Sequence, residues 1–234
     1  MSEISRRVAV IPAKSCSAGI PNKNFRRLHG KPLFMHTVEQ ALAAHVFSDV
    51  VLVLDDSGYT LIDVDALESG GVTVIVRPAH LSNPEVHAIF VVFYVIQHLE
   101  LGVEDAVAML LPTSPFRTPR TIREGMTALL TQKVEAVVGV TKTTWRANNL
   151  RVISDDGRLE FLTQSIDTIA QRQSEPQVYG VNGSFFAALV PTIVRSRTFH
   201  VSGAMPLITP SHEALDLNTL DDWAEAESRV REVH

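Results

Sequence analysis

The sequence predicts an α/β fold in which helices cover both faces of a largely parallel sheet. Two observations lead to this class. Short apolar runs, typical of strands, alternate along the chain with segments whose apolar residues recur every three to four positions, as in helices. The runs are also continuously apolar, as in Val50–Leu54 (VVLVL), which is typical of strands that are buried on both faces.

The elements follow in a regular order until the middle of the chain. The expected strands are Val8–Pro12, Val50–Leu54, Val72–Val76, Ala106–Leu111, Ala136–Val140 and Val181–Leu189. The expected helices are Leu33–Ala44, Thr60–Ser69, Ala88–Leu99, Thr121–Thr131 and Leu220–Val233, the last with Asp221 and Asp222 in its first turn. The rhythm breaks in the polar segment from Thr141 to Gln177, which predicts a hairpin or extension. We therefore expect one domain, residues 1–234, with an arm at about 141–177.

Composition narrows the class of protein further. Hydrophobic residues make up 45% of the 234 residues, which suits a well-filled core. The formal net charge of -5 argues against broad binding to nucleic acid or to an anionic membrane. The N-terminus lacks the apolar core of a signal peptide, and no window reaches the apolar length of a membrane span. With one cysteine, Cys16, no internal disulfide can form, so we expect a cytoplasmic protein.

The most informative segment is Ile11–Asn24, which reads IPAKSCSAGIPNKN and follows the first expected strand. Its small residues would let a phosphate approach backbone N–H groups, and Lys14 and Lys23 could neutralise the phosphate charge. The alternative is a loop with two solvated lysines. Neither a Gly-Lys-Ser/Thr ending nor a Gly-x-Gly-x-x-Gly spacing is present. Cys16 is interpreted as a small packing residue, because no His or Asn context marks it as a nucleophile.

Two further candidates lie where strands are expected to end, which is where open α/β sheets collect their ligands. Asp55 follows the second strand. In Leu110–Arg117 (LLPTSPFR), two prolines stiffen the backbone around Thr113 and Ser114, whose hydroxyls could face a ligand. The alternative is a helix start at Thr118-Pro119, and both interpretations are compatible.

Asp216 is the candidate metal ligand. It lies between Leu215 and Leu217, so strand alternation would place it on the opposite face from both. Magnesium usually takes one or two protein carboxylates beside phosphate oxygens, and Asn218 could assist weakly or through water. The alternative is a cap or a surface charge. The nine histidines show no metal-ligand spacing, and none is assigned a catalytic role.

A polar triplet, Gln171–Gln173, precedes Tyr179 and the pair Asn182-Gly183. Arg172 could form an ion pair with a substrate carboxylate or phosphate, because its planar guanidinium matches both groups. As an isolated triplet the segment could equally be an ordinary polar loop.

Taken in order, these segments resemble the acylneuraminate cytidylyltransferase family, the CMP-sialic acid synthetases, and more distantly the CMP-Kdo synthetases. The family pattern includes Ile-Pro-Ala-Arg-x-x-Ser-Lys-Gly-Ile-Pro-x-Lys-Asn, Gly-Lys-Pro-Leu, Arg-Pro-x-x-Leu, Leu-Gln-Pro-Thr-Ser-Pro-Leu-Arg, Arg-Gln before a Tyr, Asn-Gly and Asp-Ile-Asp. The matching segments here are Ile11–Asn24, Gly30–Leu33, Arg77–Leu81, Leu110–Arg117, Arg172-Gln173 before Tyr179, Asn182-Gly183 and Asp216–Asn218.

The resemblance implies a three-layer αβα Rossmann-like nucleotidyltransferase fold with a protruding dimerisation arm. It also implies transfer of CMP from CTP to an acidic sugar, with Mg²⁺ as cofactor, release of pyrophosphate, and a homodimer whose arm reaches the partner's site. The acceptor hydroxyl would attack the α-phosphorus in line. By the resemblance, the catalytic residues are Lys14, Lys23 and Asp216, and the metal ligands are Asp216 and Asn218. The nucleotide-binding residues are Ala13, Lys14, Ser15, Lys23, Asn24, Asp55, Arg77, Thr113 and Ser114; the acceptor-binding residues are Leu111, Arg172, Gln173 and Asn182.

Several positions depart from the family pattern. Lys14 replaces an arginine, Ala18 a lysine, Leu111 a glutamine that faces the acceptor, and Asn218 the second aspartate. Loss of a buried polar contact can change substrate discrimination by about 10⁴-fold, so the acceptor need not be a sialic acid. Two alternatives stay open: transfer with another base or to a non-sialic acceptor such as a phosphonate, and a degenerate homologue that binds nucleotide without turnover.

Overall fold

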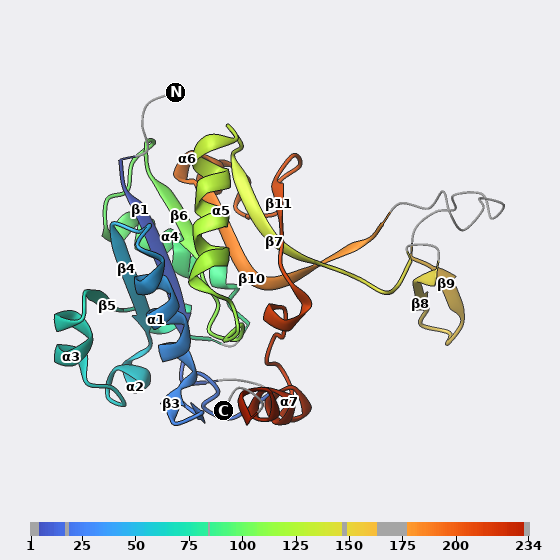
Figure 1. The fold of residues 1–234 in the computed structure, drawn as a ribbon, viewed down its shortest axis with the longest axis horizontal. Helices are drawn as coiled ribbons and strands as arrows, with labels where there is room; N and C mark the ends of the chain where they lie inside the picture. The colour runs from blue at the N-terminus through green and yellow to red at the C-terminus, as the bar shows by residue number, and fades with distance from the viewer. Residues whose placement is uncertain (1–4, 17–18, 84, 147–148, 163–176, 232–234) are drawn as a thin grey trace.

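The computed structural model describes residues 5–16, 19–83, 85–146, 149–162 and 177–231 (Figure 1). Within these ranges the centre is a seven-stranded sheet of order β11-β7-β10-β6-β1-β4-β5. Its strands are β1 (Arg7–Ala13), β4 (Asp49–Leu54), β5 (Val72–Val76), β6 (Ala106–Met109), β7 (Ala136–Lys142), β10 (Tyr179–Leu189) and β11 (Met205–Ile208).

The sheet is mainly parallel, as the continuous apolar runs predicted. β1 lies between β4 and β6 and is parallel to both, and β5 extends this half of the sheet in the same sense. β10 runs antiparallel to β6 and β7, and β11 pairs with β7 in parallel. The predicted α/β class with a largely parallel sheet is therefore confirmed, with one antiparallel strand inside it.

Helices cover both faces of the sheet. The longer ones are α1 (Leu33–Ala44), α4 (Ala88–His98), α5 (Pro119–Thr131), α6 (Val190–Ser196) and α7 (Leu220–Arg231). Ala9 and Ile11 of β1 share one apolar core with residues of α1 and α5. Val8 and Val10, which point the other way, share a second core with residues of α4 and α6. The alternation along β1 thus gives the three-layer αβα arrangement that Figure 1 shows.

Some predicted elements differ from the observed ones. The helix expected at 60–69 begins only at Val64, as α3 (Val64–Ser69), because the Asp63 carboxylate caps it there; a separate short helix, α2 (Asp56–Tyr59), capped by Asp55, precedes it. The strand expected to reach Leu111 ends at Met109. Several described elements had no sequence-based prediction: α2, α6, β11, the two-residue strands β2 (Arg27–Leu28) and β3 (Lys31–Pro32), and the 3₁₀ turns η1 (Ala79–Leu81) and η3 (Ser211–Glu213).

The segment expected to form an arm leaves the sheet. β7 and β10 run outward together in Figure 1, and the antiparallel pair β8 (Arg151–Ile153) and β9 (Leu159–Phe161) lies beyond them. Gly157, with φ +80, turns the chain between these two strands. Within the described ranges every helix is too short or too polar to cross a lipid bilayer.

A third apolar cluster joins the C-terminal helix to two loops. Trp223 of α7, 2% exposed, packs with Ile20 of the first loop and with Leu217. The Arg26 guanidinium lies over the Trp223 ring, 4.6 Å from its centroid. α7 therefore holds the loop after β1 against the segment that contains Asp216.

Replacing Trp223 by alanine should destabilise the protein strongly. Removing a fully buried indole leaves a cavity between α7 and both loops, which costs about 3–5 kcal/mol. Chemical denaturation followed by circular dichroism measures this change. Leu220→Ala is the control, because Leu220 lies on the same helix but is 60% exposed, so this variant should unfold near the wild-type midpoint. Equal losses for both variants would contradict the packing role of Trp223.

Candidate active site

A cavity of about 520 Å³ lies at the carboxyl ends of the parallel strands. Lys14 reaches it from the loop after β1, Arg77 from the end of β5 and Thr113 from the loop after β6, while Asp216 and Asn218 reach it from the segment before α7. Segments far apart in sequence thus meet at one edge of the sheet. The lining also includes Pro12, Gly19, Lys23, Asn24, Leu81, Val86, Ala88, Val91, Leu111 and Pro112.

The loop after β1 is fixed by hydrogen bonds rather than by a glycine-rich turn. The Ser15 backbone N and Oγ both donate to Asp55 Oδ2, at 2.9 and 2.7 Å. Nδ2 of the buried Asn24 donates to the Lys14 carbonyl at 2.8 Å. Asp55 and Ser15 do not line the cavity, and the structure shows them holding the backbone on which Lys14 is placed.

Asp55 is kept ionised by these donors. Burial alone would raise its pKa, but the hydrogen bonds from the Ser15 side chain and backbone and from the Gly58 N–H outweigh burial, and the charge of Arg77 adds to them. The net effect lowers the pKa of Asp55 below its ordinary value.

Asp55→Asn should therefore destabilise the protein at neutral pH but much less in acid. A lowered carboxyl pKa stabilises the fold fully above the ordinary value of 3.8, and this stabilisation is lost as pH falls through the lower folded-state pKa. Denaturant midpoints of both proteins at pH 7 and pH 3 test this expectation. A difference that persists unchanged at pH 3 would contradict it.

The basic side chains that line the described cavity are Lys14, Lys23 and Arg77. Burial lowers the pKa of each one; the charge of Arg77 lowers that of Lys14 further, whereas Asp216 and Asp222 counteract the effect at Lys23. Three cations held close together in a partly buried site favour a ligand with several negative charges.

Arg77 has one unused donor in this site. Its Nε donates to Ser82 Oγ at 3.2 Å, while the buried Nη2 has no hydrogen-bond partner among the described residues. The residue is only 4% exposed. Because an unsatisfied buried donor is costly, this atom indicates a missing acceptor on a ligand.

The prediction that Asp216 lies at the end of a strand is wrong. Residues 214–218 form a loop between η3 and α7, because Leu217 N donates to the Thr113 carbonyl at 2.8 Å and no strand pairing continues from there. Lys23 Nζ donates to the Leu217 carbonyl at 2.5 Å, which ties this loop to the first one. Asp216 and Asn218 nevertheless lie together, since Asn218 Nδ2 donates to Asp216 Oδ2 at 2.7 Å.

The residues at Asp216 fit a magnesium ion. Asp216 Oδ1 is buried and has no hydrogen-bond partner in the described structure, so one carboxylate oxygen is left for a cation. The described residues contain no cluster of three or more His, Cys, Asp or Glu that could enclose a metal. One carboxylate with few further protein ligands suits Mg²⁺, which commonly completes its shell with water and substrate phosphates.

Ser114 and Gly183 lie beside this carboxylate. Ser114 is fully buried and its Oγ has no partner among the described residues, although it does not line the cavity. Gly183 has φ +70, and a Cβ there would lie 3.6 Å from Ser114 Oγ and 3.9 Å from Asp216 Cγ. The absence of a side chain at 183 therefore keeps space open next to Asp216.

The remaining predicted residues are placed as follows. Asn182 is buried in β10, where its Oδ1 accepts from the Ser184 N–H and Oγ and its Nδ2 donates to Thr209 Oγ1. It holds an irregularity in β10 and does not line the cavity. Ala13 is buried at the end of β1. Arg172 and Gln173, together with Ala18, lie outside the described residues, so their predicted roles stay predictions.

Sequence reasoning missed the part of the apolar wall of the cavity that comes from α4 and the loop before it. Ala88 and Val91 line it from the first turn of α4 and Val86 from the loop before it, whereas Pro12, Leu81, Leu111 and Pro112 belong to motifs that were singled out. The close approach at Gly19 was also missed, where any Cβ would collide with the backbone oxygen of Asn218. The periodic apolar pattern of α4 gave no sign that one side of its first turn faces a ligand site.

Comparison with known proteins places this site in a family. A family model described as cytidylyltransferase matches residues 8–209. The chain belongs to the cytidylyltransferase family. The predicted class of enzyme, a nucleotidyltransferase, is therefore confirmed.

Curated relatives of this cytidylyltransferase act on several acidic sugars. The chain is 32% identical to the CMP-N,N'-diacetyllegionaminic acid synthase of Legionella pneumophila, with 94% of each chain covered. It is 29% identical to an N-acylneuraminate cytidylyltransferase of Escherichia coli, covering 92% of this chain but only 50% of the relative. It is 22% identical to the pseudaminic acid cytidylyltransferase of Campylobacter jejuni, with 93% of each covered.

Solved structures share the fold of this cytidylyltransferase. A CMP:2-keto-3-deoxy-manno-octonic acid synthetase, solved with CTP, superposes with a TM-score of 0.70 at 14% identity over 98% of this chain and 100% of the other. The 4-diphosphocytidyl-2C-methyl-D-erythritol synthase of Anaerococcus prevotii gives 0.65 at 16% identity, over 97% and 98%. At these identities the likeness establishes the Rossmann-like nucleotidyltransferase fold alone.

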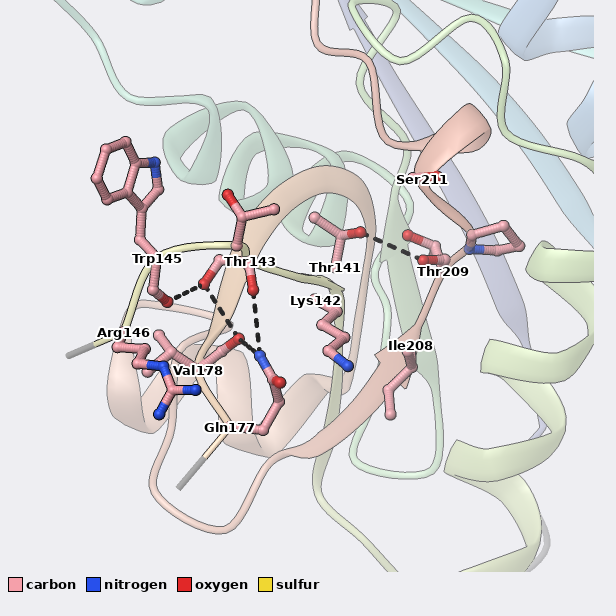
Figure 2. Close-up of a pocket in the computed structure, with 12 residues that line it drawn as sticks. Thr141, Lys142, Thr143, Trp145, Arg146, Gln177, Val178, Ile208, Thr209 and Ser211 are labelled. Atoms are coloured by element: carbon pink, nitrogen blue, oxygen red, sulfur yellow. Dashed lines mark hydrogen bonds between the residues drawn. The ribbon is translucent and has the colours of Figure 1, made fainter. Parts of the chain in front are cut away.

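A second cavity, of about 700 Å³, lies at the root of the arm (Figure 2). Gln177 Nε2 donates to the carbonyls of Thr143 and Val178, at 3.2 and 2.9 Å, and joins the two strands there. Lys142 and Arg146 give the lining a basic character. The other lining residues are Thr141, Thr144, Trp145, Ile208, Thr209, Pro210 and Ser211.

Proposed function

We propose that this cytidylyltransferase transfers CMP from CTP to a hydroxyl of an acidic sugar and releases pyrophosphate. The observation that carries the proposal is the gathering of Lys14, Lys23 and Arg77 around one cavity, beside the unpartnered oxygen of Asp216. A triphosphate matches the cations, and its magnesium ion matches the carboxylate.

The proposed mechanism follows from these positions. Lys14 and Lys23 bind the phosphates and neutralise the negative charge that develops as pyrophosphate leaves. Asp216, assisted by Asn218, would hold Mg²⁺, which supplies further charge neutralisation on the phosphate oxygens. The apolar side chains of Leu81, Val86 and Val91 offer a surface for the base. The acceptor hydroxyl then attacks the α-phosphorus, the bond from phosphorus to the pyrophosphate oxygen breaks, and the hydroxyl proton passes to solvent.

The acceptor that we favour is an acylated acidic sugar of the N,N'-diacetyllegionaminic acid type. Leu111 and Ala88 line both the nucleotide cavity and a neighbouring cavity of about 420 Å³. That neighbour is lined mostly by apolar and aromatic groups, including Phe186 and Phe199. Leu111 offers no side-chain hydrogen bond, so a polar group of the acceptor beside it would stay unpaired, whereas a methyl group would pack against it. An acyl substituent therefore suits this position better than a hydroxyl.

Pyrophosphate release from each of the four nucleoside triphosphates tests the proposal. The acceptor panel contains N,N'-diacetyllegionaminic acid, N-acetylneuraminic acid, pseudaminic acid, Kdo and a phosphonate. We expect release with CTP and an acidic sugar, fastest with the diacetylated one. Release only with a phosphonate or another base would replace this proposal by the first alternative. Nucleotide binding without release from any pair would establish the degenerate homologue.

We also propose a homodimer joined through the arm and working in the cytoplasm. The arm carries apolar side chains exposed to solvent, with Trp145 at 65%, Ile153 at 73% and Leu159 at 73%. A second copy could cover them. The cytoplasm suits a chain whose single cysteine, Cys16, is exposed and free.

Light scattering of the purified protein tests the dimer. We expect twice the chain mass at micromolar concentration, and conversion to the monomer by Ile153→Asp. The matched control is Leu61→Asp, which changes a residue 59% exposed on the body of the protein and should leave the mass unchanged. A monomeric wild type would contradict the proposed dimer without affecting the proposed reaction.

A further inference from the structure

Arg117 is a fully buried cation directly before α5. Its Nη1 donates to the Ser184 carbonyl, and its Nη2 donates to Thr37 Oγ1 at 2.9 Å and to the Leu111 carbonyl at 3.2 Å. One guanidinium thus joins α1, the loop after β6 and β10. No part of it lines the nucleotide cavity.

Glu213 is a buried anion at the start of α5. It is 4% exposed, and its carboxylate accepts from the Thr118 N–H at 3.3 Å, from Thr118 Oγ1 at 3.2 Å and from Thr121 Oγ1 at 2.5 Å. An anion at a helix N-terminus is favourable. Burial lowers the pKa of Arg117 to about 9, and the charge of Glu213 counteracts this effect.

Both charges hold backbone that leads into the candidate active site. Arg117 fixes the Leu111 carbonyl, and two residues later the Thr113 carbonyl accepts from Leu217 N at 2.8 Å. Glu213 anchors its segment three residues before Asp216. Burying a charge is costly and rarely adds net stability compared with an apolar residue of the same size, so fixing the geometry is the more economical role for these two charges.

We propose that Arg117 and Glu213 are positioning residues, and that these two buried charges hold Leu111–Thr113 and Asp216–Asn218 in the arrangement in which Asp216 meets a metal-bound nucleotide. The inference rests on the proposed function, because it takes Asp216 as the cation ligand. Neither residue touches the substrate.

Binding of Mn²⁺ in the presence of CTP, measured by electron paramagnetic resonance, tests the proposal without turnover. Glu213→Gln removes the charge but keeps the shape, and should raise the half-saturating Mn²⁺ concentration about tenfold, as loss of support behind a metal ligand typically does. Arg117→Lys keeps the charge but loses the planar fork, and should act in the same direction. Thr121→Val keeps both charges but removes one hydrogen bond to Glu213. It should raise the half-saturating Mn²⁺ concentration by about fivefold.

The matched control is Glu124→Gln, which neutralises an exposed carboxylate on α5, the helix whose start Glu213 contacts. It should leave Mn²⁺ binding unchanged. In an Asp216→Asn background, Glu213→Gln should have no further effect, because the two residues act through one oxygen. A folded Glu213→Gln protein with the wild-type half-saturation would overturn the positioning role alone; should that variant not fold, Thr121→Val decides in the same way. A wild type that binds no Mn²⁺ with CTP would overturn the proposed function as well.

Discussion

Asp216→Ala should lower kcat by on the order of 10³-fold, as removal of one charge-stabilising group in a catalytic site often does. The physical reason is the buried Oδ1, which has no partner among the described residues and is the atom left to hold Mg²⁺. The fold should survive, because Asp216 is only half-buried and lies in a loop. Pyrophosphate release and the thermal midpoint measure the two effects separately.

The control for Asp216 is Asp221→Ala, which removes an exposed carboxylate from the first turn of α7. It should release pyrophosphate at nearly the wild-type rate. Normal turnover by Asp216→Ala would refute the metal role. Equal losses for both variants would instead attribute the effect to the general negative charge of this region.

Lys23→Ala should weaken CTP binding by on the order of 10²-fold. Lys23 lines the cavity, and its Nζ also donates to the Leu217 carbonyl at 2.5 Å, so its loss removes a phosphate-facing charge and a link between two loops. Isothermal titration calorimetry with CTP measures the affinity. Lys31→Ala is the matched control, since Lys31 forms an exposed ion pair with Glu39.

The pH dependence adds a second check on Lys23. Burial lowers the pKa of Lys23 below its ordinary value of 10.5, so the ammonium loses its proton at a lower pH than a solvated lysine does. The affinity for CTP should therefore decline with rising pH before 10.5 is reached, and Lys23→Ala should show a shallower decline. An unchanged affinity in Lys23→Ala at neutral pH would remove Lys23 from the nucleotide site.

Elements built from local patterns could be predicted from the sequence. The helix Leu33–Ala44 and the strand Val72–Val76 were predicted with the bounds that the structure has, because each consists of one uninterrupted pattern. The helix expected at 60–69 starts four residues late, at Val64, since the Asp63 carboxylate caps it there. A helix cap depends on a single side chain, whereas an apolar periodic pattern is read over many residues and does not show where the cap lies.

The part of the candidate site that comes from one continuous motif could be predicted from the sequence. Lys14 and Asn24 lie in one continuous motif, and both reach the cavity. Asp216 was placed near it for the wrong reason, because the alternation of its neighbours suggested a strand where the chain forms a loop. Asp55 was expected to face nucleotide, but its carboxylate is turned toward Ser15 and the start of α2.

By itself, the sequence determined the α/β class, the strand and loop that open the nucleotide site, and the family, since each depends on neighbouring residues or on the order of motifs. Only the tertiary structure decided that β10 enters the sheet antiparallel and that Lys23 holds the Leu217 carbonyl across 194 positions of sequence. It also decided that Arg117 and Glu213 are both buried near the start of α5. These features depend on packing and hydrogen bonds between distant segments, whose energies no local pattern of residues records.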